Sequence, residues 1–255
     1  MIRSFYSAVS AMITLEAKLD SCTSNISNAN TTAYKAQDVK MKSFDEVMLQ
    51  NKDKIVGNRN VTNKIGKLSL GAEIDSTTTK YTQGNINQTG NNTDFAIDGR
   101  GFFVVQSGNE NVFTRDGNFT INNEGYLVTT TGQNVLGVNA NGQTAPIYVG
   151  NARDFYLDDR NNVIVNGRNA GRLLTADFAN YNSLERISDN YYRGTNPNYN
   201  ANVKVNQGYL EASNVNITDE MVNLMTISRN FESAQRVLTM IDDSLSIAAS
   251  KVGKV

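Results

Sequence analysis

The sequence predicts an α+β fold in which both ends of the chain form one helical domain and the middle forms a mainly antiparallel β domain. Two observations predict this class. Apolar residues near both termini recur at alternating gaps of three and four, the a/d spacing of a coiled coil. Between them, turn dipeptides recur at short intervals, which is typical of β-hairpins. We expect a discontinuous, coiled-coil-like helical domain over 1–35 and 208–255, an extended connector over 36–80 and a β domain over 81–207.

The first predicted helix has a single apolar stripe, which we call the N-terminal seam. Its spacing is unbroken as far as Ile26, where a run of small polar residues begins. We expect the seam to pack against neighbouring subunits, although an intramolecular pair with the C-terminal helix is an alternative. The thiol of Cys22 falls in this stripe, so we expect it to pack as a small hydrophobe. The predicted interface residues are Phe5, Met12, Leu15, Leu19, Cys22 and Ile26.

The segment that follows has no clean helical or strand period. Basic residues, among them Lys52, Lys54 and Arg59, alternate irregularly with Asn and Gly from about Gln50 to Ser76. Such a mixture is typical of an irregular connection. We therefore expect an extended connector.

The middle of the chain is rich in short strands and tight turns. The run from Ala96 to Val105 predicts a strand pair that bends sharply at its two glycines, and 118–121, 125–128 and 162–165 add short strands. Because these contacts are mostly local, we expect residues 81–207 to fold on their own. The predicted hairpin turns are Asp116-Gly117, Glu124-Gly125, Asn141-Gly142 and Asn166-Gly167.

A second amphipathic helix ends the chain. Asn216, three residues before Asp219, is typical of an N-cap followed by an acidic first turn, and Gly253 suits the end of a helix. The apolar stripe, which we call the C-terminal seam, is interrupted near Ser228 and Ala234. Its predicted interface residues are Met221, Leu224, Phe231, Leu238, Ile241 and Leu245.

The composition excludes most common chemistry. The 255 residues include no His and one Cys, which removes Ser-His-Asp catalysis, histidine metal sites and intramolecular disulfides. Gly99-Arg100-Gly101 lacks the third glycine and the helix of a nucleotide-binding turn, and the order of Asp158 to Asn162 does not match a calcium loop. The net charge of −1 gives no field that attracts nucleic acid. We expect no catalytic, metal or cofactor residue, no membrane span and no enzyme.

Three segments carry specific motifs. They are 24–35 at the end of the first helix, 83–105 around Asp98-Gly99-Arg100-Gly101-Phe102 and followed by 113–117, and 208–216 before the second helix. Together they closely resemble the signatures of the bacterial flagellar rod and hook proteins. The family pattern has Gly in place of Ala33, and this departure argues against a positive φ there. The matching residues are Asn25, Asn28, Asn30, Thr31, Tyr34, Lys35, Asp98, Gly99, Gly101, Phe102, Gly208, Glu211, Ser213, Asn214 and Val215.

The resemblance implies a structural subunit of the flagellar basal body. The chain length is that of a distal or proximal rod protein, since hook proteins are usually longer. The resemblance further implies self-assembly into a helical, tubular drive shaft with a central export channel, and contacts with other rod proteins, the hook protein and the components that surround the rod. Export through the flagellar secretion channel would need no cleaved signal. The alternatives are a hook-type protein and a secreted β-rich module that binds carbohydrate, although the absence of Trp disfavours the latter.

Overall fold

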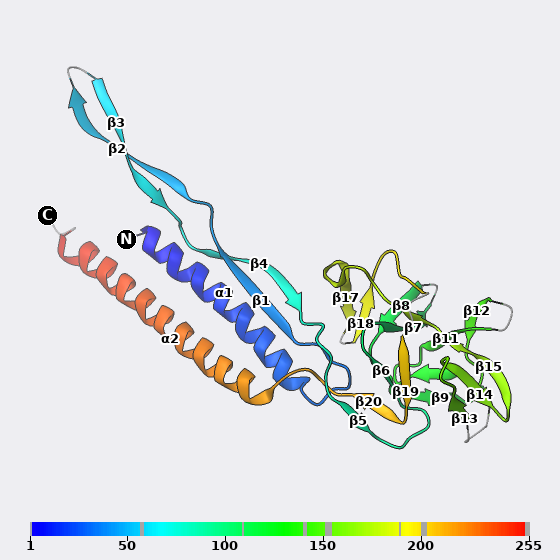
Figure 1. Ribbon diagram of the computed structural model, residues 1–255. Coiled ribbons are helices and arrows are strands. Elements are labelled where there is room, and N and C mark those ends of the chain that lie inside the picture. The colour runs from blue at the N-terminus through cyan, green and yellow to red at the C-terminus, as the bar shows by residue number, and fades with distance from the viewer. Residues whose placement is uncertain are drawn as a thin grey trace. The chain divides into compact units, whose positions relative to one another are not determined.

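The structure, a computed structural model, divides into two compact units (Figure 1). Each unit is made of segments that are distant in sequence. Unit 1 comprises Met1–Ile26, Gln37–Thr78 and Ile217–Val255, and unit 2 comprises Ser27–Ala36 and Thr79–Asn216. The residues that the structure describes are 2–56, 59–108, 110–139, 142–150, 155–188, 190–199 and 203–252.

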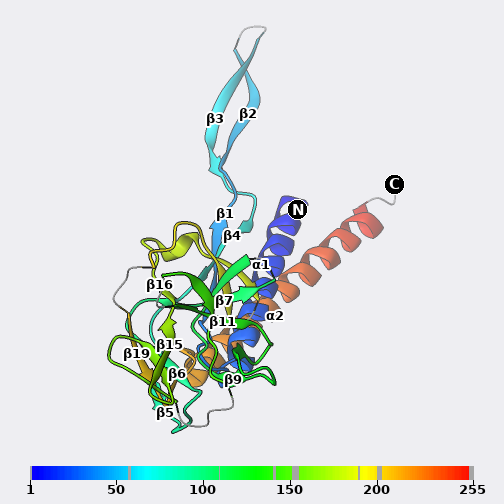
Figure 2. The ribbon, with the colours of Figure 1, turned by 90° about the vertical axis from the view of Figure 1, so that its right-hand side faces the viewer.

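Unit 1 contains two long helices. They are α1 (Ile2–Ser27) and α2 (Ile217–Ile247), and α2 continues into a π-helical turn, Ala248–Val252. As expected, α2 begins directly after Asn216 and carries two acidic residues in its first turn, where they complement the helix dipole. Its predicted stop, Gly253, lies outside the described residues. Figures 1 and 2 both show the N-terminal end of α1 lying apart from the C-terminal end of α2.

The segment expected to be an extended connector forms four strands in unit 1. β1 (Gln37–Ser43) pairs with β4 (Ala72–Thr79), and β2 (Val47–Val56) pairs antiparallel with β3 (Arg59–Leu68). Register shifts between Leu49 and Gln50 and between Asn51 and Lys54 interrupt the β2–β3 ladder. A bulge reverses the alternation of side chains, which explains why the sequence showed no period here.

Unit 2 is built on antiparallel sheets. Among the described residues, twelve strands form its largest sheet, whose main path runs β13-β14-β15-β11-β7-β8-β18-β17. A 3-10 helix, Tyr181–Ser183, precedes the last two strands in sequence. The strands are β7 (Phe102–Ser107), β8 (Glu110–Thr114), β9 (Phe119–Ile121), β10 (Leu127–Thr129), β11 (Asn134–Val138), β12 (Thr144–Pro146), β13 (Phe155–Leu157), β14 (Asn162–Val165), β15 (Arg168–Leu173), β16 (Thr175–Ala176), β17 (Glu185–Ser188) and β18 (Tyr191–Arg193).

The core of unit 2 lies on both faces of this sheet. Successive side chains of a strand point to opposite faces, and β7 accordingly places Phe103 and Val105 in one apolar cluster and Phe102 and Val104 in another. All four side chains are buried. A strand covered on both faces is expected to be apolar at every position, which accounts for the run Phe102–Val105. The α+β class predicted from the sequence is confirmed.

Both ends of unit 2 are joined by strand pairing. β5 (Ile86–Gln88) pairs with β20 (Tyr209–Glu211), and β6 (Phe95–Asp98) pairs with β19 (Lys204–Gln207). The segment 208–216 and the loop 27–36 therefore group with the β unit, whereas the sequence boundaries assigned them to the helices. The strands of residues 37–78 group with the helices instead.

Two of the four predicted hairpin turns are confirmed in full. Gly125 lies between β9 and β10, and Asn166 and Gly167, both with positive φ, join β14 to β15. Gly142 joins β11 to β12, but Asn141 lies outside the described residues. The fourth turn is wrong, because β8 pairs with β7 and β18 rather than with β9. There Gly117 passes so close to Phe95 that a Cβ would lie 1.7 Å from its carbonyl oxygen.

Candidate functional site

The loop that leaves α1 is a compact turn whose second half is buried. The backbone N–H of Thr31 donates to the carbonyl of Asn28 at 3.1 Å, and the Thr31 hydroxyl donates to the Asn28 side chain at 3.1 Å. Ala33 has a φ of 56°, contrary to the expectation from the sequence, and its N–H donates to the carbonyl of Glu211 at 2.8 Å. The next three residues, 34–36, are buried like Ala33 itself.

Lys35 enters a buried cluster of three charged residues, which we call the signature cluster: Lys35, Arg115 and Glu211. The Lys35 ammonium lies 2.5 Å from Oε1 of Glu211, and Nη1 of Arg115 lies 3.3 Å from Oε2 of the same carboxylate. Each cation also donates to a backbone carbonyl, Lys35 to Thr82 and Arg115 to Gly99, both at 2.8 Å. The carboxylate thus joins the loop after α1 to the β unit.

The cluster is almost completely withdrawn from solvent. The side chains of Lys35 and Glu211 are 0% exposed and that of Arg115 is 3% exposed. Burial lowers the pKa of the Lys35 ammonium, although the Glu211 carboxylate opposes this effect. Because removing one partner of a buried ion pair leaves an uncompensated charge, such a cluster fixes one arrangement of its segments. Its role here is to hold geometry.

A second anchor binds the same loop at Thr32, three residues before Lys35. Oδ1 of Asp116 accepts a hydrogen bond from the Thr32 hydroxyl at 2.8 Å and another from the N–H of Asn118 at 3.1 Å. The side-chain amide of Asn190 donates to the carbonyl of Thr32 at 2.7 Å. Burial raises the pKa of the Asp116 carboxyl above its ordinary value. The loop is therefore held by side chains from two distant parts of the β unit.

Asn214 ties together the segments at the edge of unit 2. Its Oδ1 accepts from the N–H of Ala36 at 2.8 Å, while Nδ2 donates to the carbonyls of Lys80 and Thr82 at 2.7 and 3.1 Å. An asparagine side chain offers both an acceptor and donors, and here it uses both. Asn214 lies two residues before the last residue of unit 2, and α2 begins at Ile217.

In unit 1, α1 uses a polar face to contact the strands. The Ser7 hydroxyl donates to the carbonyl of Leu70 at 3.0 Å, and the N–H of Ala72 donates to the Ser10 hydroxyl at 3.2 Å. Between them, a Cβ on Gly71 would lie 2.2 Å from the Ser10 oxygen. Small side chains on the helix and a glycine in the loop between β3 and β4 allow this close approach.

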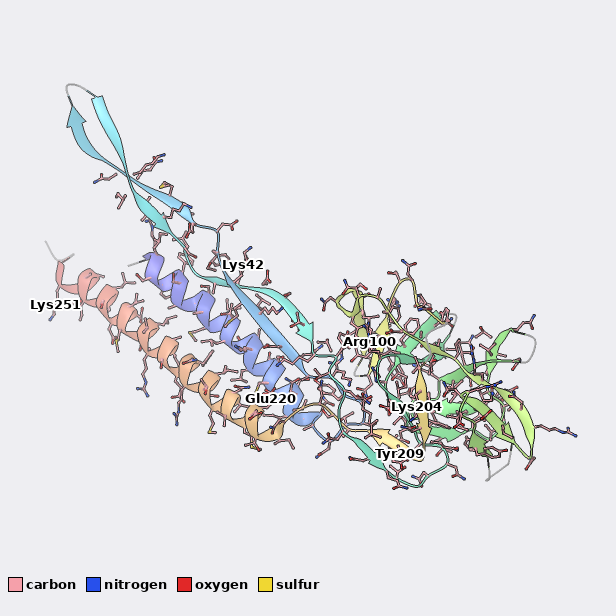
Figure 3. The ribbon with its side chains drawn as sticks, in the orientation of Figure 1. Lys42, Arg100, Lys204, Tyr209, Glu220 and Lys251 are labelled. Atoms are coloured by element: carbon pink, nitrogen blue, oxygen red, sulfur yellow. The ribbon has the colours of Figure 1, made fainter. Side chains whose placement is uncertain are left out.

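The two helices meet near the end of α1 and the start of α2. The Cys22 thiol donates to the carbonyl of Glu220 and lies 3.1 Å from its Oε2, and the Asn25 amide donates to Oε1 at 3.3 Å. Figure 3 labels Glu220 in the first turn of α2. Burial raises the pKa of the Cys22 thiol to about 12. The thiol is therefore protonated and acts as a buried hydrogen-bond donor.

Five of the six residues predicted for the C-terminal seam lie on one half-buried face of α2, and the sixth, Met221, lies beside it. Ile227 is the buried residue of α2, and Met221 is 51% exposed. The less exposed positions include Ile227, which lies three residues after Leu224 and four before Phe231. With Ile227 in place of Ser228, the alternating gaps of three and four are uninterrupted. The half-buried positions on this face are Leu224, Phe231, Ala234, Leu238, Ile241 and Leu245.

Three family models match successive parts of the chain. The model described as "Flagella basal body rod protein" covers 5–35, "Flagellar hook protein FlgE/F/G D1 domain" covers 96–168, and "Flagellar basal body rod FlgEFG protein C-terminal" covers 206–251. The flagellar basal-body rod protein FlgG of Bacillus subtilis (strain 168) is 32% identical over 96% of this chain and 97% of that protein. The chain belongs to the flagellar rod and hook protein family.

Other relatives in this family match along the whole chain. The flagellar basal-body rod protein FlgF of Caulobacter vibrioides is 29% identical, with all of both chains covered. The flagellar hook-basal body complex protein FlhO of Bacillus subtilis is 27% identical, again with all of both chains covered.

The structure brings residues from all three family motifs to one place. Lys35 of the first motif and Glu211 of the third bind each other directly, and Gly99 of the second accepts from Arg115. The Arg115 guanidinium also lies over the Phe102 ring, 5.4 Å from its centroid. Tyr34 is buried under the Arg186 guanidinium at 4.7 Å.

The other predicted motif residues have local roles. Gly101 and Gly208 have positive φ, and a Cβ on Gly101 would meet Val203 at 2.8 Å. The Ser213 hydroxyl accepts from the N–H of Val215 at 3.3 Å. Asn25 lies in unit 1, where its side chain exchanges hydrogen bonds with the backbone of Gln37. Asn30 and Asp98 are exposed.

Sequence reasoning did not assign roles to several residues that complete the site. Arg115 and Asp116 lie in a stretch recognised as typical of the family, so that motif was the available signal. Asn190 and Thr82 lie outside the family motifs, and nothing in their local sequence distinguishes them. None of the helices described is long and apolar enough to cross a membrane.

Proposed function

We propose that this chain is a structural subunit of the flagellar basal-body rod, which assembles with copies of itself into a helical, tubular drive shaft around a central export channel. The observation that carries this proposal is the exposure of its helices. Over the 31 residues of α2, Ile227 is the buried residue, and the remaining seam side chains stay partly accessible. A helix of that length gains most of its stability from packing an apolar face, and neighbouring subunits supply that packing.

The proposed interfaces are the two seams. Heterologous contacts that repeat without closing generate a helical filament, and one seam on each terminal helix gives every subunit two such contacts. The proposed interface residues are those predicted from the sequence for both seams, Met221 included, and Ile227 lies on the same side of α2 as the C-terminal seam. In this arrangement the terminal helices form the axial domain and the β unit forms an outer domain.

The signature cluster gives the shaft its stiffness. Torque carried by the helices must pass through the chain segments that leave α1 and enter α2. Lys35 and Glu211 lie in those two segments and bind each other as a buried ion pair. Breaking such a pair costs about 3–5 kcal/mol, so the two segments transmit force as one piece.

The names of the relatives support assembly with basal-body rod and hook components, and the further partners are proposed from the family resemblance. The proposed partners are copies of this chain, other rod proteins, the hook protein, the components that surround the rod and the flagellar export apparatus. The proposed location is the basal body outside the cytoplasmic membrane, reached through the flagellar export channel.

Limited proteolysis compares the dilute full-length chain with assembled rods. We expect rapid trimming of residues 1 to about 30 and about 215 to 255 in the monomer, because the helices lack the partners that would cover their seams. The β unit resists, and assembly protects both helices. Equal resistance of the helices in the dilute monomer and in the rod contradicts the proposal.

A further inference from the structure

We infer that a groove between α1 and the strands of unit 1 receives the outer face of the C-terminal half of α2 from a second copy of this chain. The inference rests on the proposed function, which supplies the second copy. It concerns a surface distinct from both seams.

The groove has a volume of about 660 Å³ and is lined mainly by apolar side chains. α1 contributes Tyr6, Val9 and Ile13, spaced three and four apart as on one face of a helix. The strand segments contribute further apolar side chains, among them Phe44 and Leu70. Tyr6 is 64% exposed and Ile13 is 56% exposed. A contiguous apolar surface of this kind marks an interaction site.

The chain's own α2 does not fill this groove. At 3.6 residues per turn, the Tyr6–Ile13 face lies roughly 100° around α1 from the N-terminal seam, because Tyr6 and Ile13 directly follow the seam residues Phe5 and Met12. α2 contacts α1 on the seam side, where Cys22 binds Glu220. Ser7 and Ser10 meanwhile fix α1 to the strand segment that forms the other wall. The groove is therefore open while the chain is alone.

The outer face of α2 has the shape and length of a fitting occupant. Met240 and Ile247 are 64% and 54% exposed and lie on the side of α2 away from its seam, and Val237, 48% exposed, flanks them. From Val237 to Ile247 there are ten residue steps, about 15 Å of helix, against about 10 Å for the stripe from Tyr6 to Ile13. An apolar helix face laid into an apolar groove is a common recognition mode.

The charges around the two surfaces are complementary. The groove includes the acidic side chains of Asp45 and Glu73 and the basic side chain of Arg3. The outer side of α2 carries the basic side chains of Arg236 and Lys251, which are opposite in charge to the two groove carboxylates, and also the acidic side chains of Glu232 and Asp243. These charged residues of α2 are exposed, and Figure 3 labels Lys251 in the turn that follows α2. Opposite charge at the rim favours docking in one orientation.

Disulfide formation between two differently substituted chains tests this inference. Chains carrying Ile13→Cys and Met240→Cys, each with Cys22→Ala, are mixed, allowed to assemble and oxidised. We expect a disulfide-linked species of twice the chain mass, because a disulfide requires Cα atoms within about 7 Å. The bond joins different chains, so it can form only between copies. The matched control replaces Met240→Cys by Asp242→Cys, which is also exposed but lies on the seam side of α2. With this control we expect no disulfide-linked species of twice the chain mass.

A charge exchange gives an independent readout. We expect Glu73→Arg and Arg236→Glu each to reduce the fraction of chain that sediments as polymer, and the two changes in one chain to restore it.

Four outcomes overturn the inference. One is assembly without the Ile13–Met240 bond, another is an equal yield with Asp242→Cys, and a third is a bond between two Ile13→Cys chains. The fourth is that, in isolated basal bodies, Ile13→Cys becomes linked to a different protein. All four leave the proposed function standing. Failure of the unsubstituted chain to assemble at all contradicts the proposed function itself.

Discussion

Ala33 adopts the left-handed backbone conformation at the position where the family motif has glycine. Its φ is 56°, and its N–H donates to the carbonyl of Glu211. For a residue with a Cβ this conformation costs about 1–2 kcal/mol. The Ala33 methyl is buried, with 2% of the residue exposed, and burying such a group returns about 0.8 kcal/mol. The tertiary contacts of the loop therefore override the local preference.

We expect Ala33→Gly to change the free energy of unfolding by less than about 1 kcal/mol, because relief of the backbone cost is offset by the lost methyl and by the greater freedom of glycine in the unfolded chain. Ala33→Val should destabilise the chain clearly more, since a β-branched residue is a strong outlier at positive φ. Thermal unfolding of both variants measures this. Equal melting temperatures for the two variants would contradict the argument.

Asp116 makes the stability of the loop depend on pH. Burial raises the pKa of its carboxyl in the folded state, so the folded state binds a proton more readily than the unfolded state does. The stability that this group contributes is therefore present below its ordinary pKa and is lost as the pH rises through the folded value. At neutral pH the buried charge is a net cost.

We expect Asp116→Asn to remove this cost while keeping an oxygen that accepts from Thr32 and Asn118. The change in melting temperature caused by Asp116→Asn should be more positive at pH 7 than at pH 4. Melting curves at the two pH values measure the difference. Thr32→Val, which removes the donor and leaves the carboxyl, is the control. A difference that is larger at pH 4 would contradict the assigned direction.

Each terminal helix has more than one face suited to contacts with other elements or subunits. Beside its apolar seam, α1 has a stripe of small hydroxyl residues that bonds to strand backbones, with Ser7 and Ser10 as examples. α2 carries a partly covered seam and exposed apolar residues on its opposite side. A helix that buries little within its own chain but is apolar on two faces is suited to contacts with several neighbours.

We expect Leu238→Asp to stop rod growth and abolish swimming. Leu238 lies on the half-buried face of α2, so the β unit of each subunit still folds. In the assembly, every subunit would bury a carboxylate without a partner, at a cost of several kcal/mol per site. Swimming assays and electron microscopy of basal bodies measure the effect.

The matched control for this change is Arg168→Ala, at an exposed position of the β unit, because Lys251 lies on the outer face of α2 that a second copy is inferred to contact. Asn122→Ala does not serve as a control, although its sequence position suggested a solvated residue. Its side-chain oxygen accepts from the N–H groups of Glu124 and Tyr126 and so shapes a turn. Normal rods in a Leu238→Asp strain would remove this face of α2 from the assembly surface.

The whole β unit depends on segments from outside its predicted boundaries. Residues 27–36 and 208–216 supply Lys35 and Glu211, while Arg115 comes from 81–207. A fragment limited to 81–207 would bury Arg115 without its carboxylate. The prediction that this range folds alone is therefore replaced by one that includes both flanking segments.

We expect a chain of residues 27–216, with 37–78 replaced by a short glycine linker, to unfold cooperatively. The linker is feasible because the carbonyl of Ala36 accepts from the N–H of Lys80 at 2.8 Å, so the two ends already lie side by side. The fragment 81–207 should show no cooperative transition. Calorimetry of both fragments measures this, and a sharp transition in 81–207 alone would contradict the prediction.

Local physics made several features predictable from the sequence. The three-four spacing from Phe5 to Ile26 predicted α1, Asn216 with Asp219 marked the start of α2, and Asn166-Gly167 predicted a hairpin turn. Each involves residues within a few positions of one another, whose backbone preferences and faces follow from spacing alone. The family resemblance also rested on contiguous motifs.

Which distant segments meet could not be predicted from local sequence and depends on the folded chain. Lys35 and Glu211 are far apart in sequence, and each could equally have been a solvated charge. The same ambiguity applies to Ser7 and Ser10, because a polar residue on a helix does not reveal whether water or a strand backbone satisfies it. Register shifts interrupt the two-residue alternation of side chains along β2 and β3, so the sequence showed no strand period there. A polar group can be buried only where a hydrogen-bonding partner satisfies it. In this chain those partners lie on segments distant in sequence, so the local sequence does not reveal them.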